Sequence, residues 1–134
     1  MPSGRPLEFD PDEALVKAME AFHETGYAAT STADLTSVMG LSKSSLYQSF
    51  GSKRELFLKC LDRYCRQERE RETARMAGAL PAKQYLVDLF QSFIEVDERT
   101  RSPRGCLLVN TACEFGGRDA EISGFVAAQW AQSQ

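Results

Sequence analysis

Side chains that can form hydrogen bonds are concentrated in one short stretch of the sequence: Lys43, Ser44, Ser45, Tyr47, Gln48 and Ser49. The apolar residues beside them, Leu46 and Phe50, are four positions apart, which places both on one face of a helix. The other face would then present small and polar groups. Such a helix suits the major groove of DNA, which is about 12 Å wide and lined with donors and acceptors. The predicted chemistry is recognition by hydrogen bonding.

Residue types that catalyse reactions or bind metals are scarce. The sequence has a single histidine, His23, and no C-x-x-C pair, so it predicts no zinc site. It also has no nucleophile elbow and no phosphate-binding loop. We therefore expect no enzyme, no metal and no cofactor. The cysteines lie in helical patterns, and we expect them to stay reduced: Cys60, Cys65, Cys106 and Cys113.

Charge is distributed unevenly along the chain. The net charge of −3 argues mildly against non-specific nucleic-acid binding by the whole chain. Residues 1–39 contain two basic and seven acidic side chains, whereas residues 40–60 contain four basic ones and one acid, Glu55. Lys53 lies at a predicted helix N-terminus, which suits phosphate through its N–H groups and dipole. The positive charge therefore lies close to the polar stretch.

Length and composition indicate a globular protein. The chain has 134 residues, of which 43% are hydrophobic and 26% charged, enough for about one domain with a buried core. No apolar run approaches the roughly 18 residues that span a bilayer, and the N-terminus has no apolar stretch typical of a secretion signal. We expect a cytoplasmic protein without a membrane segment.

Helical periodicity predicts an all-α fold, because no stretch alternates as a strand would. N-cap residues mark the helix starts: Asp10, Ser31, Ser42 and Ser52. Asp34 and Glu55 follow two of these serines at capping-box spacing. The first expected helix begins near Pro11 and ends before Gly26. The others run over 32–39, 43–49, 53 to about 77, 82–98, 106–115 and from Asp119 onward.

This layout predicts three regions. Residues 1–10 form a flexible arm, residues 11–52 a three-helix unit, and residues 53–134 a region of longer helices. Two of the later helices carry apolar side chains: Leu86, Leu89, Phe90, Phe93 and Ile94 in one, and Phe125, Val126 and Trp130 in the other. No stop signal follows the last helix. We expect that another chain covers this surface, or that the C-terminal helices of a longer protein are missing.

Residues 31–49 have the outline of a helix-turn-helix motif, with Gly40 in the turn. The runs Ala29–Leu35 and Gly40–Phe57 resemble the DNA-binding domain of the TetR/AcrR family of bacterial transcriptional repressors. This similarity extends without gaps over roughly residues 15–61, and it includes the Leu46-Tyr47 pair and the Phe50-Gly51 turn followed by Lys53. A shorter stretch, from Gly105 to Glu114, is similar to a subset of the family.

The resemblance implies a role for each matching residue. Lys43, Ser44 and Ser45 would lie near base edges, at the tip of the recognition helix. Tyr47 and Gln48 would reach phosphate and sugar, and Ser49 belongs to the same face. Thr32 and Lys53 would hold the DNA backbone. Backbone contacts set the register, and base contacts select the sequence.

The resemblance also implies partners and a mechanism. The family acts as a homodimer that reads palindromic double-stranded DNA operators, with half-sites about 34–36 Å apart or more. A small-molecule effector binds among the C-terminal helices, moves the fourth helix and releases the DNA. The predicted architecture is thus an N-terminal DNA-binding domain followed by a helical ligand-binding and dimerisation domain.

Several assignments have a simpler alternative. The effector-pocket candidates, which could instead be core residues because the same stripes must pack the helices, are Phe90, Phe93, Leu108, Phe125 and Trp130. Cys106 follows Gly105 at a predicted helix N-terminus, where the dipole favours thiolate. It is either a sensor of oxidants or electrophiles or a small buried cysteine. Tyr47 could be a core residue, and Lys53 with Arg54 could be a solvated surface pair.

The alternative function from another class is a helical protein–protein interaction domain that does not bind DNA. The two functions differ in the face of the third helix. A protein that reads DNA leaves Lys43, Ser44, Tyr47 and Gln48 exposed close to Lys53, whereas an interaction domain has no reason to group them.

Overall fold

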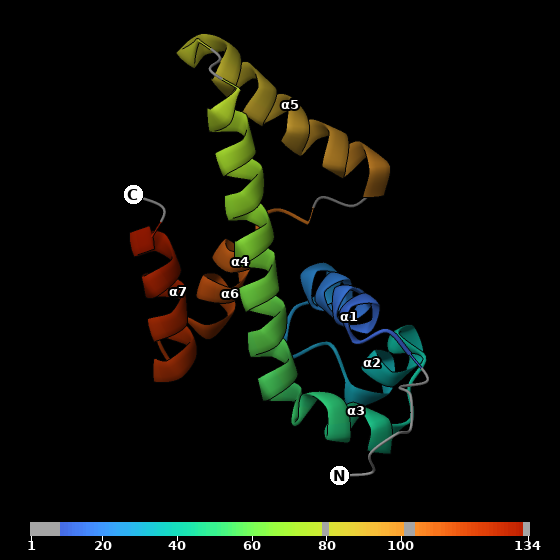
Figure 1. Ribbon diagram of the computed structural model, residues 1–134. Helices are drawn as coiled ribbons and strands as arrows, with labels where there is room; N and C mark the ends of the chain where they lie inside the picture. Colours follow the sequence, from blue (N-terminus) through green and yellow to red (C-terminus); the bar gives the residue numbers. More distant parts are fainter. Residues whose placement is uncertain (1–8, 79–80, 101–103, 133–134) are drawn as a thin grey trace. The chain divides into compact units, whose positions relative to one another are not determined.

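The computed structural model describes the chain except residues 1–8, 79–80, 101–103 and 133–134, and except the side chains of residues 92–93 and 96–100. Its described part contains helices and no strands (Figure 1), which confirms the predicted all-α fold. In chain order the helices are α1 (Pro11–Thr25), α2 (Thr32–Met39), α3 (Lys43–Phe50), α4 (Lys53–Ala77), α5 (Ala82–Thr100), α6 (Leu107–Phe115) and α7 (Ala120–Gln132).

The helix starts follow the N-cap residues that the sequence predicts. Asp10, Ser31 and Ser42 each accept a hydrogen bond from a backbone N–H in the first turn of the helix that follows. Four boundaries differ slightly from the expectation. Helix α3 includes Phe50, α5 extends to Thr100, Cys106 is the N-cap of α6 rather than its first residue, and α7 begins at Ala120. Each difference amounts to a turn or less and leaves the order of elements unchanged.

The chain divides into two compact units, Met1–Cys60 and Leu61–Gln134, with the division inside α4. In the first unit, α1, α2, α3 and the start of α4 enclose an apolar core. Its buried side chains are Ala14, Ala18, Met19, Phe22, Leu35, Met39, Leu46, Phe50, Leu56, Phe57 and Cys60. Phe22 meets Phe57 edge-on, with ring centroids 4.9 Å apart, an arrangement that aromatic pairs favour.

A buried threonine fixes the connection between α1 and α2. Thr30 is almost fully buried. Its hydroxyl donates to the Gly26 carbonyl at 2.6 Å and shares a 2.5 Å hydrogen bond with the Thr25 hydroxyl. Leaving a buried hydroxyl without a hydrogen-bond partner costs free energy. Loop conformations that break these bonds are therefore disfavoured directly before Ser31, the N-cap of α2.

The second unit has a smaller described core, contributed by α4, α6 and α7. Its buried side chains are Leu61, Cys65, Leu107, Leu108, Thr111, Ile122 and Val126. Helices α6 and α7 pack together (Figure 1), and Arg69 on α4 donates a hydrogen bond to Gln129 on α7.

The apolar stripe predicted for the fifth helix is largely exposed. Leu86, Phe90 and Ile94 are each more than half exposed, with Phe90 at 63%. The side chain of Phe93, which belongs to the same stripe, lies outside the described residues. Leu89, on the same stripe, is partly exposed. Of the two stripe residues that the sequence assigns either to the effector pocket or to the core, Phe90 has a described side chain, and its exposure makes the core alternative wrong for it. Apolar periodicity predicts a helix face, but burial depends on what packs against it.

Among the helices that the structure describes, none is both long and apolar enough to cross a membrane.

Candidate nucleic-acid interface

Helix α3 is anchored by two side chains and presents the rest. Leu46 is 1% exposed and Phe50 5%, so one side of the helix is buried in the core of the first unit. Lys43, Ser44, Gln48 and Ser49 are exposed, and Tyr47 is 44% exposed. The alternative of a core tyrosine at position 47 is therefore wrong. The ammonium of Lys43 lies 6.0 Å from the centre of the Tyr47 ring, so these two side chains extend over the same exposed turn.

The start of α3 is fixed by paired serines. The Ser42 hydroxyl accepts a 3.1 Å hydrogen bond from the Ser45 backbone N–H and lies 2.9 Å from the Ser45 hydroxyl. Ser45 is accordingly only partly exposed. The sequence predicts Ser45 near base edges, and its hydroxyl is engaged with Ser42 in this structure.

A left-handed turn connects α2 to α3. Gly40 has φ 67° and ψ 32°, a conformation that glycine adopts without the penalty other residues meet. The next residue, Leu41, donates its N–H to the Thr36 carbonyl at 3.1 Å. This turn joins α2 to α3 through residues 40–42, and it gives the helix-turn-helix outline expected from the sequence.

The N-terminus of α2 is closed by a capping box. Asp34 donates its N–H to the Ser31 hydroxyl at 3.0 Å, and Ser31 donates its N–H to the Asp34 carboxylate at 2.9 Å. Hydrogen bonds that the Asp34 carboxylate accepts, first from the Ser31 backbone N–H and then from the Ser31 side chain, hold the pKa of Asp34 below its ordinary value of 3.8. Thr32, the predicted backbone contact, is the first residue of α2 and is partly exposed.

A second capping box begins α4. Glu55 donates its N–H to the Ser52 hydroxyl at 3.2 Å, and the Glu55 carboxylate accepts from the Ser52 N–H at 3.3 Å. This bonding stabilises the first turn of α4, which carries Lys53. A helix N-terminus of this kind favours anions through its N–H groups and dipole.

Two lysines of α4 lie over aromatic rings. The Lys53 ammonium is 4.3 Å from the centre of the Tyr27 ring. The Lys59 ammonium is 5.8 Å from the Phe50 ring centre and donates a 3.3 Å hydrogen bond to the Phe50 carbonyl. Lys59 thereby closes the C-terminus of α3, whereas Lys53 contacts the connection between α1 and α2.

Sequence reasoning did not identify Tyr27 as part of this region. The residue lies in a connection, 26 positions before Lys53, so no helical period links the two. The sequence signal that bears on this contact is the four-residue spacing of Lys53 and Phe57, which places Lys53 on the same helix face as a core aromatic residue. A residue and the one four places later share a helix face, and the ring of Phe57 lies 4.9 Å from that of Tyr27.

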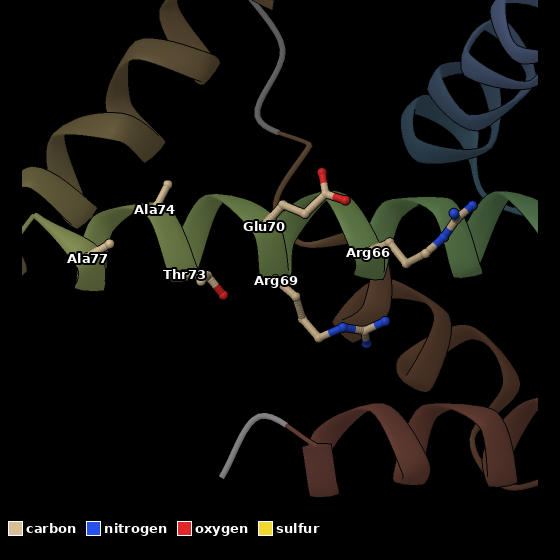
Figure 2. A pocket seen from close by; sticks show the side chains of 6 residues that line it. All are labelled: Arg66, Arg69, Glu70, Thr73, Ala74 and Ala77. Carbon is tan, nitrogen blue, oxygen red and sulfur yellow. The ribbon is translucent and has the colours of Figure 1, made fainter.

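The effector-pocket candidates differ in how far their side chains are exposed to solvent. Leu108 is buried and Phe125 half-buried, whereas Phe90 and Trp130 are exposed; the side chain of Phe93 lies outside the described residues. None of them lines the shallow hollow on α4 drawn in Figure 2, whose residues are Arg66, Arg69, Glu70, Thr73, Ala74 and Ala77. The effector pocket stays a prediction.

Cys106 is half-buried at the N-cap of α6. Its thiol lies within hydrogen-bonding reach of the Tyr64 hydroxyl, whose pKa is raised, first by burial and then by the neighbouring Cys106. Cys65 is buried, and this burial raises the pKa of its thiol to about 11. The proposed sensing role of Cys106 stays a prediction. Within the described ranges, no cluster of three His, Cys, Asp or Glu side chains could hold a metal ion.

Comparison with known proteins identifies relatives along most of the chain. Residues 14–60 match the family described as "Bacterial regulatory proteins, tetR family". The HTH-type transcriptional regulator YezE of Bacillus subtilis is 32% identical over 126 residues, which make up 94% of this chain and 65% of the relative. The HTH-type transcriptional repressor ComR of Escherichia coli is 32% identical over 132 residues, 98% of this chain and 63% of the relative.

A solved structure is also similar. It is a cysteine mutant of the TetR family transcriptional regulator CifR, complexed with double-stranded operator DNA. The TM-score is 0.72 at 34% sequence identity, and the match covers 90% of this chain and 65% of the other. The present chain thus spans just under two thirds of the length of these relatives.

Proposed function

Because this chain belongs to the tetR family of bacterial regulatory proteins, we propose that it is a transcriptional regulator that reads DNA with α3. The observation that carries the proposal is the exposed polar face of α3. Leu46 and Phe50 fix the helix from one side, and Lys43, Ser44, Tyr47 and Gln48 occupy the other. Side chains of this size and polarity fit the major groove.

The proposed contacts fall into two classes. Lys43, Ser44 and Ser45 contact base edges, and they select the sequence. Tyr47, Gln48 and Ser49 reach sugar and phosphate. Thr32 on α2 and Lys53 on α4 bind the DNA backbone from helix N-termini that capping boxes hold in place. Backbone contacts of this kind supply register and most of the salt-dependent affinity.

We further propose that the active species is a homodimer on a palindromic operator, and that it represses transcription until a small-molecule effector releases it. The complex of CifR with operator DNA and the repressor name of ComR support this proposal. A small-molecule effector can change DNA affinity only by its differential affinity for two arrangements of the protein. Helix α4 would couple effector binding to DNA binding, since it contributes residues to both units. Such a regulator acts in the cytoplasm, where bacterial DNA lies.

The competing assignments fit less well. If the protein were an interaction domain that does not bind DNA, there would be no reason for four polar side chains to share the exposed face of α3. The relatives are named as transcriptional regulators, which are not enzymes, in agreement with the expectation from the sequence.

Fluorescence anisotropy tests this function. The probe is a labelled duplex from the region directly upstream of the protein's own gene, titrated at several salt concentrations. We expect tight binding that weakens steeply with salt. Tyr47→Ala and Lys53→Ala should each weaken binding, and Lys53→Ala should also reduce the slope of log K against log salt by about 1.

Lys17→Ala is the matched control. Lys17 is an exposed lysine of α1, paired with Glu13 at 3.5 Å, and its loss removes the same charge outside the proposed interface. An equal effect of Lys17→Ala and Lys53→Ala would refute the assigned face. If no member of a genome-wide fragment library bound either this chain or a version extended at the C-terminus, DNA reading itself would be refuted.

A further inference from the structure

The ring of Tyr27 is held firmly by the aromatic core of the first unit. It lies 4.9 Å from the Phe57 ring, and it stacks on Phe22 at 6.1 Å with an interplanar angle of 19°. Phe22 and Phe57 are both almost fully buried. The position of the Tyr27 ring is therefore set by the fold rather than by its own rotamer preference.

This fixed ring carries the charged end of Lys53. The ammonium lies 4.3 Å from the ring centre, well inside the approximately 6 Å within which a cation is attracted by an aromatic face. Lys53 and Phe57 are four residues apart on α4, so the lysine stem lies along the helix face that packs on Tyr27. The contact follows from the core packing.

The contact limits the freedom of a side chain that is otherwise flexible. Lysine loses considerable rotamer entropy when it is fixed in an interface. Lys43 offers a comparison within the same unit, since its ammonium lies 6.0 Å from the Tyr47 ring, at the outer limit for such a contact. Of these two lysines, Lys53 is the more firmly placed before any DNA arrives.

We propose that Tyr27 is a positioning residue, which holds the Lys53 ammonium at the N-terminus of α4 for its contact with the DNA backbone. This inference rests on the proposed function, which assigns that contact to Lys53. Tyr27 itself is not placed in contact with DNA. Its effect on affinity is to reduce the ordering that Lys53 must undergo on binding.

A double-mutant cycle on DNA affinity tests the proposal. Tyr27→Leu removes the ring, and Tyr27→Phe keeps it; both are measured with Lys53 intact and with Lys53→Ala. We expect Tyr27→Leu to weaken operator binding about two- to fivefold, and to have no effect in the Lys53→Ala background. Tyr27→Phe should stay within about twofold of the parent, because a phenyl ring also attracts cations. Thermal unfolding of each variant reports whether the fold is intact.

Nuclear magnetic resonance of the protein without DNA supplies an independent readout. The Lys53 ε-methylene group adjoins the ammonium that lies 4.3 Å from the Tyr27 ring centre, so we expect its proton resonances to be shifted upfield. Tyr27→Phe should keep that shift, and Tyr27→Leu should abolish it. The upfield shift of the Lys53 resonances is measured on the parent protein, so the test does not depend on whether the Tyr27→Leu variant folds.

The outcomes separate this inference from the proposed function. Weakening by Tyr27→Leu that persists at full size without Lys53 would mean that Tyr27 acts through the fold, which overturns the inference. Tighter binding by Tyr27→Leu would mean that the ring holds the lysine away from DNA, which also overturns it, as does an unshifted Lys53 resonance. Absence of DNA binding by the parent protein would overturn the function and this inference together.

Discussion

Replacing Gly51 by alanine should destabilise the first unit more than the same change at Gly40. Both glycines have positive φ. Gly40 is left-handed helical, whereas Gly51 has φ 80° and ψ −146°, a region that is essentially restricted to glycine. An added Cβ would meet no atom within 4 Å at Gly40, but at Gly51 it would lie 1.6 Å from the Glu55 carboxylate.

The size of the effect follows from these differences. Gly40→Ala introduces backbone strain of about 1–2 kcal/mol. Gly51→Ala introduces strain of about 1–3 kcal/mol and also expels a carboxylate that accepts from the Ser52 N–H, a capping interaction worth about 1 kcal/mol. We therefore expect a loss of about 2–4 kcal/mol at Gly51, a large part of the roughly 5–15 kcal/mol that stabilises a domain.

Urea unfolding followed by far-ultraviolet circular dichroism measures both losses. A third variant, Glu55→Ala, isolates the capping contribution. Because Gly51→Ala already displaces the carboxylate, adding Glu55→Ala to it should cost less than Glu55→Ala alone. Equal losses for Gly40→Ala and Gly51→Ala, or full additivity with Glu55→Ala, would refute the reasoning.

Three further predictions concern buried or hydrogen-bonded groups. Thr30→Val should lower the free energy of unfolding by about 1 kcal/mol, because the Gly26 carbonyl loses the 2.6 Å hydrogen bond it accepts; an unchanged thermal unfolding curve would contradict this. The pKa of Asp34 is lower in the folded state than its ordinary value of 3.8, so its stabilising effect is present above pH 3.8 and is lost on further acidification. Asp34→Asn should remove this part of the pH dependence of the free energy of unfolding. If the parent and the variant lost stability in parallel on acidification, the prediction would be wrong. The buried Cys65 thiol, with its pKa raised to about 11, should be alkylated near neutral pH far more slowly than the exposed Cys113, as mass spectrometry of labelled peptides can show; equal rates would contradict that burial.

The sequence predicted the local features of the fold well, because their causes are local. Ser31 caps α2, and Ser52 caps α4, through side chains three residues away at most. The same holds for Leu46 and Phe50, whose helical spacing alone indicated which face of α3 is buried.

Features that depend on packing between distant segments were not predictable in this way. The contact of Lys53 with Tyr27 joins two elements through the packing of Phe57, and no periodic signal expresses it. Likewise, Phe90 belongs to a regular apolar stripe and yet is exposed, since a stripe indicates that a helix has an apolar face and not what covers it.

The anchoring of α3 by Leu46 and Phe50 has an evolutionary consequence. Since the fold depends on these two side chains, substitutions at Lys43, Ser44 and Gln48 are largely neutral for folding, as surface changes usually are. Gene duplicates of such a protein can therefore exchange these positions one at a time without passing through unfolded intermediates. If α3 reads DNA as proposed, the same backbone can diverge toward new binding sequences by changes at these exposed positions, without a change of fold.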